Sequence, residues 1–413
     1  MLFFVEAATS GSGLRLLRQL TDRGEPTVFV TSNRAKYSGA EDAQVLDRLD
    51  GEGRLFEVDS TEDYRTPGAL VSMPGPHGVI ASGDRYLAFA AHLAEDLGAP
   101  FPSRRAIDVF RDKRRARELY DTLGVGRVRW APADSEERVR SFASDVAPIG
   151  VIKNVRGTGS QDVGIYAGVV EAVETWRLLS AADRYLAGAL MIEEYVQGPL
   201  VSCEVLVSAG HAQVLGYTDR QLSPFPTVAE VGYTFPADLP GALQHDMRTA
   251  VDAVVAALQI EQAFLHVEFV LRETGAYVVE INPRLPGALV TYMLQDCLTP
   301  DFAQMVADSA LGRPVSAATT NGLVSSGYIA YAPARARASA PSDRGAASAF
   351  PWVVDVLGGV ITGAEIAPAS DYRGAVGHVR TLAPSRSIAQ TAARAAAELM
   401  IPPSAPRTDT EEP

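Results

Sequence analysis

The pattern of hydrophobic and polar positions alternates between two kinds of element in the N-terminal part of the chain. Short apolar runs are typical of buried strands, and they occur at Leu2–Val5, Thr27–Val30 and Gly78–Ala81. Apolar residues spaced every three or four positions are typical of helix faces, and they occur at Leu14, Leu17 and Leu20 and at Leu87, Ala90, Leu93 and Leu97. Asp84 is suited to cap the second helix. The alternation predicts a small parallel α/β domain over residues 1–104.

The central part of the chain has a different pattern, with paired strands and longer helices. Residues 105–315 are interpreted as one α+β domain. Its helices and strands are expected at Asp112–Leu123, Val151–Lys153, Leu243–Leu258, His266–Leu271 and Tyr277–Ile281.

Residues 316–402 are interpreted as a C-terminal α/β domain, with a strand near Gly327–Tyr331 and a helix over Ile388–Met400. Between the two, Pro333–Ser348 is rich in Ala, Ser, Arg and Pro, which predicts a mobile loop that is either a linker or a lid. Residues 403–413 are expected to form a disordered tail.

Composition and charge narrow the class of protein. The chain has 413 residues, 47% of them hydrophobic and 21% charged, which is typical of a soluble globular protein with two or three domains. The net charge of −13 argues against nucleic acid or an anionic membrane as a partner. Two cysteines, Cys203 and Cys297, suit a reducing compartment. With no signal-like start and no long apolar run, we expect a cytoplasmic protein without a membrane span.

The most informative segment is an expected hairpin that carries acidic residues. Gly275 lies in the turn between the two strands, where a left-handed residue is needed. A turn centred on Thr274 places Glu268 opposite Glu280, although a bulge would shift this by one residue, and alternation places Asn282 on the face of Glu280. Facing carboxylates repel each other, and a divalent cation removes the repulsion. Two carboxylates and an amide oxygen are ligands that Mg²⁺ prefers, so the hairpin predicts a metal site.

Basic and glycine-rich segments supply candidates for phosphate binding. Arg284 follows the acidic strand and can grip a phosphate or carboxylate through two N–H groups. Lys153 ends an apolar strand, and a loop with Gly157, Thr158, Gly159 and Ser160 follows. Such a loop can direct backbone N–H groups at phosphate oxygens, although a simple hairpin turn has the same composition. Lys113 begins a helix, where a surface charge is the alternative, and His266 is interpreted as a packing or supporting residue.

Taken in order, these segments resemble the ATP-grasp superfamily of carboxylate–amine ligases. The resemblance covers Asp112-Lys113, Lys153 with its glycine-rich loop, Glu193-Glu194-Tyr195-Val196, Glu268, and Glu280-Ile281-Asn282-Pro283-Arg284. It implies an ATP-grasp fold with a Rossmann-like domain before it and a C-terminal domain that completes the catalytic core. The continuation Leu285-Pro286-Gly287 is similar to L-amino acid ligases and carnosine synthase, and differs from biotin carboxylase.

The resemblance also implies roles for individual residues. Lys113, Lys153 and the loop from Gly157 to Ser160 would contact ATP phosphates, and Glu193 to Val196 would meet adenine. Mg²⁺, with Mn²⁺ as an alternative, would be held by Glu268, Glu280 and Asn282. Arg284 would be catalytic by stabilising the transferred phosphoryl group. Leu200 stands where the family has a ribose-binding acid, so either Glu204 or another residue would take that role, or the ribose would be held more loosely. Glu204 could also belong to the phosphate and metal region.

The expected reaction joins a small carboxylic acid, such as an amino acid, to an amine. ATP would activate the acid as an acyl phosphate, and the amine would then displace phosphate. The partners are therefore small molecules, and a homodimer is one option for the assembly. Three alternatives stay open: ATP-dependent carboxylation or ribonucleotide synthesis on the same fold, a nucleotide-binding protein without catalysis, and a dinucleotide-dependent oxidoreductase. The last rests only on Gly11-Ser12-Gly13, which lacks the full glycine spacing.

Overall fold

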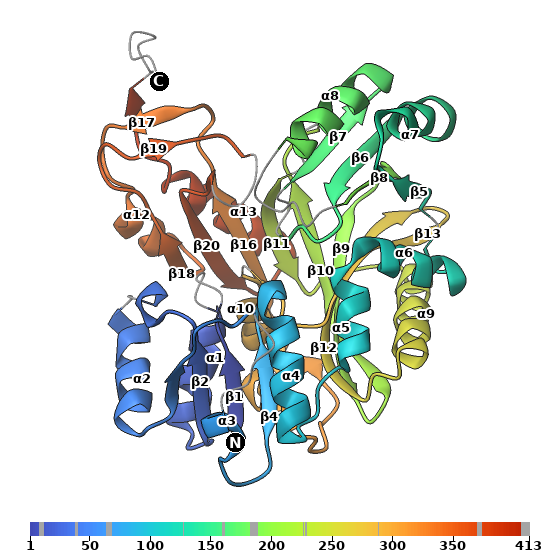
Figure 1. Ribbon diagram of the computed structural model, residues 1–413. Helices are drawn as coiled ribbons and strands as arrows, with labels where there is room; N and C mark the ends of the chain where they lie inside the picture. The colour runs from blue at the N-terminus through green and yellow to red at the C-terminus, as the bar shows by residue number, and fades with distance from the viewer. Residues whose placement is uncertain are drawn as a thin grey trace. The chain divides into compact units, whose positions relative to one another are not determined.

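The computed structural model describes residues 1–7, 12–37, 40–62, 68–126, 128–158, 162–181, 189–225, 227, 229–287, 289–369 and 374–405. The chain divides into two compact units (Figure 1). The first consists of residues 1–127, 202–217 and 238–321, and the second of residues 128–201, 218–237 and 322–413. Each unit therefore combines segments that are distant in the sequence. The three predicted domains cut the chain at other positions, and their boundaries stay predictions.

The first unit begins with a parallel sheet in the strand order β3-β2-β1-β4. Its strands are β1 (Leu2–Val5), β2 (Thr27–Thr31), β3 (Leu55–Glu57) and β4 (Gly78–Ala81). The helices between and after them are α1 (Ser12–Asp22), α2 (Ala40–Gly51), α3 (Gly68–Val71) and α4 (Leu87–Leu97). Phe3, Val28, Val79 and Phe89 are among the residues of a shared core. The order changes direction between β1 and β4, and in open parallel sheets ligands bind at the carboxyl edge of such a point.

The rest of the first unit is built around an antiparallel hairpin. Its strands follow the order β13-β12-β9-β10, with β9 (Leu200–Ser208), β10 (His211–Leu222), β12 (Gln262–Arg272) and β13 (Gly275–Asn282). The ends of β9 and β10 belong to the second unit. The helices are α5 (Arg104–Arg111), α6 (Lys113–Thr122), α9 (Gly241–Ala257), α10 (Val290–Cys297) and α11 (Phe302–Ala310). Short strands β14 (Leu298–Thr299) and β15 (Thr319–Thr320) pair with each other.

The second unit contains two larger sheets. One has the order β5-β8-β6-β7, with β5 (Trp130–Pro132), β6 (Ile149–Asn154), β7 (Val163–Ala167) and β8 (Leu190–Glu194), and α7 (Glu136–Ser141) and α8 (Val169–Ser180) pack beside it. In the other, the end of β10 is followed by β11 (Glu230–Phe235), β16 (Val324–Ala330), β20 (Gly377–Ala383) and β18 (Val353–Gly358). Helix α13 (Arg386–Glu398) covers one face of this second sheet, and α12 (Arg344–Ala349) packs beside β18.

Most of the expected elements are confirmed, and two expectations are wrong. Pro333–Ser348 is not an unstructured loop, because it contains β17 (Ala336–Ala338) and the start of α12, which Asp343 caps by accepting from Ala346 N. Strand β17 pairs with β19 (Glu365–Ile366) and with β21 (Ser404–Ala405). The predicted tail therefore begins with a paired strand, and residues 406–413 lie outside the described residues.

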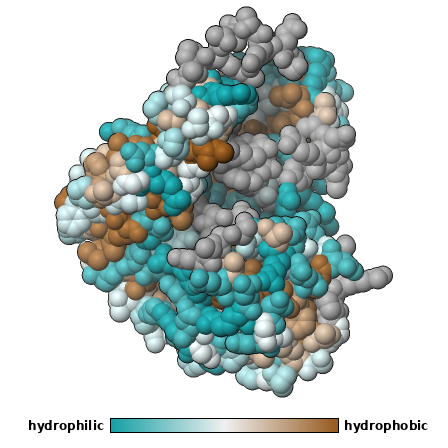
Figure 2. All heavy atoms as spheres, turned by 90° about the vertical axis from the view of Figure 1, so that its left-hand side faces the viewer, coloured by the Kyte–Doolittle hydropathy of each residue, from teal (hydrophilic) through white to brown (hydrophobic). Residues whose placement is uncertain are grey.

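The surface of the protein carries exposed apolar side chains among hydrophilic residues. Large exposed apolar side chains include Trp352, Val354 and Ile361. On the face shown in Figure 2, hydrophobic residues form small groups among hydrophilic ones. Among the residues that the structure describes, no helix has the length and hydrophobicity needed to cross a membrane.

Candidate functional site

The hairpin β12/β13 in the first unit holds the acidic residues. Glu268 pairs directly with Glu280, which confirms the predicted opposition. The route differs from the simple count, because Arg272 pairs with Gly275 around a shorter turn and a bulge after Glu268 restores the register. Gly275 has a φ of 129°, as expected for the turn. A bulge beside a functional site re-aims side chains, and here it brings the two carboxylates opposite each other.

Helix α6 brings two basic residues to the acidic strand β13. Asp112 caps this helix by accepting from Arg114 N and Arg115 N at 3.1 and 3.2 Å. Lys113 is thereby held at the first position, and its Nζ lies 3.3 Å from Glu280 Oε1. Its side chain is only 14% exposed, so Lys113 is not the surface charge that was the alternative.

Arg117 lies one helical turn after Lys113 and was not singled out by the sequence. It is buried and donates to the backbone carbonyls of Val278 and Val279, next to the bulge. Its sequence signal is the spacing of four residues from Lys113, which places both basic side chains on one face of the helix.

A series of polar contacts through His266 connects Glu268 to the buried Glu204. His266 Nδ1 lies 2.9 Å from Glu204 Oε2, and His266 Nε2 lies 3.3 Å from Glu268 Oε1. Glu204 is fully buried and also accepts from Ser202 Oγ at 2.7 Å. The structure therefore groups Glu204 with the acidic hairpin through His266. The predicted supporting role of His266 fits these contacts.

Arg284 lies at the end of the hairpin and is held by Asp84. Its Nε donates to Asp84 Oδ1, and its Nη2 donates to Asp84 Oδ2 at 2.8 Å. Burial acts to raise the pKa of Asp84, but the charge and hydrogen bonds of Arg284 outweigh it, so this pKa is lowered. Burial likewise acts to lower the pKa of Arg284, which is raised because Asp84, and then Glu280 and Glu268, outweigh that effect.

The expectation that Asp84 caps a helix is wrong. Asp84 is the first residue of a 3₁₀ turn, Asp84–Tyr86, whose cap position is Gly83, and Tyr86 occupies the cap position of α4. The Asp84 carboxylate points instead to Arg284 and Asn282. When the amide nitrogen of Asn282 faces the two carboxylates, it donates to Asp84 Oδ1 at 3.3 Å and to Glu280 Oε1 at 3.2 Å.

The other predicted residues belong to the second unit. Lys153 Nζ forms an ion pair with Glu193 Oε2 at 2.7 Å, and both side chains are buried. They lie on neighbouring strands, where Val151 pairs with Glu193 and Lys153 with Met191. Glu194 is held differently, by Arg129, which donates to both of its carboxylate oxygens.

The segment after β8 continues past these two acids. Tyr195 N donates to Ile149 O at 3.1 Å, and its ring packs edge-on against Phe225 at 5.7 Å. Val196 is half-buried. The glycine-rich segment connects the antiparallel strands β6 and β7, where Gly157 N donates to Asn154 O and Thr158 is half-buried. Gly159 and Ser160 lie outside the described residues.

The chemistry of the first unit's cluster suits a hard cation. Glu268 and Glu280 oppose each other. Asn282 faces Glu280 with its amide nitrogen, and the opposite amide orientation would turn its oxygen to the acids and complete an oxygen donor set for a metal. Lys113 and Arg284 lie beside the same acids and would complement phosphate groups. Among the described residues, no group of three or more His, Cys, Asp and Glu side chains is arranged to hold a metal ion. The hairpin set has two acids and an amide, so substrate oxygens and water would complete a Mg²⁺ shell.

Comparison with known proteins finds a match to the ATP-grasp domain in the middle of the chain. The ATP-grasp domain family model matches residues 149–292. An uncharacterized protein of Sinorhizobium fredii is 26% identical over 78% of this chain and 67% of its own length. Carnosine synthase 1 of Gallus gallus is 26% identical over 30% of this chain, and this match spans 14% of the synthase.

Solved structures match over nearly the whole chain. L-amino acid ligase from Bacillus licheniformis has a TM-score of 0.77 with 19% identity and covers 98% of each chain. The biotin carboxylase domain of 2-oxoglutarate carboxylase from Hydrogenobacter thermophilus, solved with MgADP and bicarbonate, has a TM-score of 0.64 with 19% identity, covering 96% of this chain and 89% of that one. As the sequence predicted, the chain has the ATP-grasp fold, and residues 149–292 form an ATP-grasp domain.

Proposed function

We propose that this protein is an ATP-dependent ligase that joins a small carboxylic acid to an amine and releases ADP and phosphate. The observation that carries the proposal is the hairpin, where Glu268 opposes Glu280 and where Asn282, Lys113 and Arg284 lie beside them. Opposed acids flanked by cations suit Mg²⁺ and phosphate together. The similarity to L-amino acid ligase and to carnosine synthase favours an amino acid as the acid substrate.

Each group of residues has a distinct task in this proposal. Glu268, Glu280 and Asn282 would hold Mg²⁺, with Mn²⁺ as an alternative, and the metal supplies neutralising charge for the phosphates when bound. Lys113 and Lys153 would neutralise phosphate oxygens, and the loop with Gly157, Thr158, Gly159 and Ser160 would direct N–H groups at them. The segment from Glu193 to Val196 would contact adenine. Glu204 would support Glu268 through His266 rather than hold the ribose, because its carboxylate is fully buried and bound to His266 and Ser202.

The reaction has two balanced steps. A carboxylate oxygen of the acid attacks the γ-phosphorus of ATP, the bond to the β-phosphate oxygen breaks, and an acyl phosphate and ADP result. The amine nitrogen then attacks the acyl carbon, the carbon–oxygen bond to phosphate breaks, and the amine gives up a proton. Arg284 stabilises the oxygens on which charge develops. No protein nucleophile takes part, in agreement with the full burial of Cys203, which raises the pKa of its thiol.

Carboxylation is the second candidate, because the biotin carboxylase domain that was solved with MgADP and bicarbonate shares the fold. In that case bicarbonate would replace the organic acid and would be phosphorylated by ATP.

The deciding experiment is a matrix of acids and amines assayed for ADP release, with mass spectrometry of the products. ADP that forms only when both an acid and an amine are present supports the ligase. ADP that depends on bicarbonate supports the carboxylase. If no combination releases ADP while MgATP still binds, both enzymes are excluded in favour of a nucleotide-binding protein. A cytoplasmic location and a homodimer stay predictions, to be checked by fractionation and by light scattering.

A further inference from the structure

Asp84 is an acidic residue in an unusual place for its chemistry. It lies three residues after the last residue of strand β4 and begins the 3₁₀ turn before α4, where an acid ordinarily caps a helix. Its carboxylate caps neither helical segment. Instead it binds Arg284, which lies 200 residues further along the chain, through two hydrogen bonds. Both side chains are mostly buried, with 18% and 14% exposed. Such a pairing needs a reason, because burying two charges is costly unless their contacts are good.

The geometry of the pair leaves part of the guanidinium available. An arginine side chain has five N–H bonds. Asp84 takes one from Nε and one from Nη2, and Leu285 O takes one from Nη1 at 3.0 Å. Within the part of the chain that the structure describes, one N–H of each terminal nitrogen is left. Asp84 therefore grips one edge of Arg284 and leaves a terminal edge that can bind two oxygens at once.

Asp84 also contacts the predicted metal ligands. Asn282 donates to Asp84 Oδ1 and to Glu280 Oε1, so the amide is fixed between the two acids. The charges of Glu280 and Glu268 also act on Arg284. One carboxylate from the N-terminal segment thus orients both the arginine and the amide of the hairpin end.

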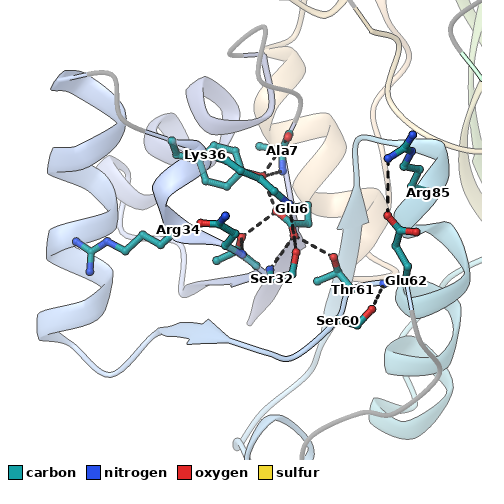
Figure 3. A network of polar contacts seen from close by, with 12 residues as sticks. Glu6, Ala7, Ser32, Arg34, Lys36, Ser60, Thr61, Glu62 and Arg85 are labelled. Atoms are coloured by element: carbon teal, nitrogen blue, oxygen red, sulfur yellow. Dashed lines mark hydrogen bonds and ion pairs between the residues drawn. The ribbon is translucent and has the colours of Figure 1, made fainter. Parts of the chain in front are cut away.

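A rigid network lies beside the segment that carries Asp84. Ser82 Oγ donates to the backbone carbonyl of Glu6 at 3.5 Å. The Glu6 carboxylate is buried and accepts hydrogen bonds from Ser32, which directly follows β2, and from Thr61, which lies four residues after β3, among others (Figure 3). This network links the segments that follow β1, β2 and β3, and Ser82 connects it to the segment before Asp84.

We propose that Asp84 is a positioning residue that holds Arg284 by one edge, so that the other edge is presented to the phosphoryl group transferred from ATP. The inference rests on the proposed function for its reaction, but the placement of the guanidinium can be tested without turnover. Asp84 itself contacts no reacting atom. Its removal leaves Arg284 present and charged but free to rotate away from the orientation needed in the transition state.

The test is a double-mutant cycle with Asp84→Asn, Arg284→Met and the combined variant. Asp84→Asn should lower kcat roughly 10- to 100-fold, the range seen when a residue that orients a functional group is lost, with little change in the KM for ATP. The combined variant should be no slower than Arg284→Met within about threefold, since residues that act as a unit are not additive. Independent multiplication of the two losses, or an unchanged kcat in Asp84→Asn, would overturn the proposal.

A matched control and a second readout keep the test interpretable. Asp301 also binds an arginine through two hydrogen bonds, from Nη1 and Nη2 of Arg23, at a more exposed place. Asn also serves well in its helix-cap position, so Asp301→Asn should leave kcat unchanged. The NMR signal of the Arg284 Nε–H, assigned by its loss in Arg284→Met, should exchange slowly with water in the unmodified protein and quickly in Asp84→Asn. If no acid and amine give ADP, the proposed function fails while this signal still reports on the pair. Equally fast exchange in both proteins contradicts the positioning role.

Discussion

Two carboxylate centres in the first unit are built in opposite ways. Glu6 is buried and accepts five hydrogen bonds from neutral donors on Thr31, Ser32, Tyr37 and Thr61, most of them at 2.8 to 2.9 Å, while Lys36 Nζ lies further away, 3.6 Å from Glu6 Oε1. Glu280 is 27% exposed, and its contacts with Lys113 and Asn282 are 3.3 and 3.2 Å long. Glu268 has a similar exposure of 21% and a 3.3 Å contact with His266.

The difference separates a structural acid from acids that are available to a ligand. Both carboxylate oxygens of Glu6 accept hydrogen bonds from these neutral donors, and Glu6 has a left-handed φ of 55°. Glu280 is paired with Lys113 and Glu268 with His266, each at 3.3 Å, and a metal or phosphate can replace such contacts. A carboxylate saturated by neutral donors is part of the fold, whereas opposed carboxylates beside cations favour a charged ligand.

The largest expected effect comes from the hairpin. Glu280→Ala should abolish ADP release, because it removes one of two opposed metal ligands, and it should leave the thermal midpoint within a few °C of the unmodified protein. The reason for the small structural effect is that removing one of two repelling carboxylates also removes their repulsion. Turnover assays across a Mg²⁺ titration, with circular dichroism for the fold, provide the measurement.

Glu273→Ala is a suitable control, since Glu273 lies in the exposed turn of the same hairpin. It should retain full activity. Wild-type ADP release by Glu280→Ala at saturating Mg²⁺ contradicts the metal assignment.

A smaller effect is expected from the buried pair in the second unit. Lys153→Met leaves Glu193 buried without its partner and should cost about 3–5 kcal/mol of unfolding free energy. Lys113→Met should cost no more than about 1 kcal/mol, because its partner Glu280 is 27% exposed and reaches water. Urea denaturation at neutral pH measures both.

The double variant Lys153→Met with Glu193→Leu separates structure from nucleotide binding. It should recover most of the stability, since a buried ion pair can be replaced by apolar residues of similar volume. It should not recover ATP affinity, measured by calorimetry, if Lys153 binds phosphate. ATP affinity that returns together with stability would assign Lys153 to the fold alone.

The hairpin site could be predicted because its chemistry is local in the sequence. Glu268, Gly275, Glu280 and Asn282 lie in one hairpin, so alternation places Glu280 and Asn282 on one face, and the bulge after Glu268 offsets the shorter turn to keep Glu268 opposite Glu280. Asp84 and Arg117 could not be predicted in this way, because their partners lie 200 and 161 residues away. Only the tertiary fold brings such groups together. In the sequence, Asp84 has the pattern of a helix cap and Arg117 that of a charged residue on a helix surface.

The fold was predictable to a similar degree. Strands with continuous apolar runs, such as Leu2–Val5 and Gly78–Ala81, were found with their correct bounds. Strand β3, with the sequence Leu-Phe-Glu, is too short for a periodic signal, and it forms because β2 offers it a parallel edge. The β17–α12 segment was misjudged because small residues dominate it, and its structure depends on pairing with β19 and β21.

An effect smaller than that of Lys153→Met concerns Glu6 and is best seen in the pH dependence of stability. Burial acts to raise the pKa of Glu6, but hydrogen bonds from Tyr37, Ser32 and Thr31 outweigh it and lower this pKa. A carboxylate with a lowered folded-state pKa contributes stability above its unfolded pKa of about 4.3, and this contribution is lost as the pH falls through the folded value. Glu6→Gln keeps the shape but places an amide N–H₂ among donors, so it should cost about 1–3 kcal/mol at neutral pH. The difference in unfolding free energy between the two proteins should be constant from pH 8 to about 5 and shrink below pH 4, with kcat unchanged throughout. A difference that grows as the pH falls would mean that Glu6 is protonated in the folded protein, and the contrast with the hairpin acids would then have to be drawn on geometry alone.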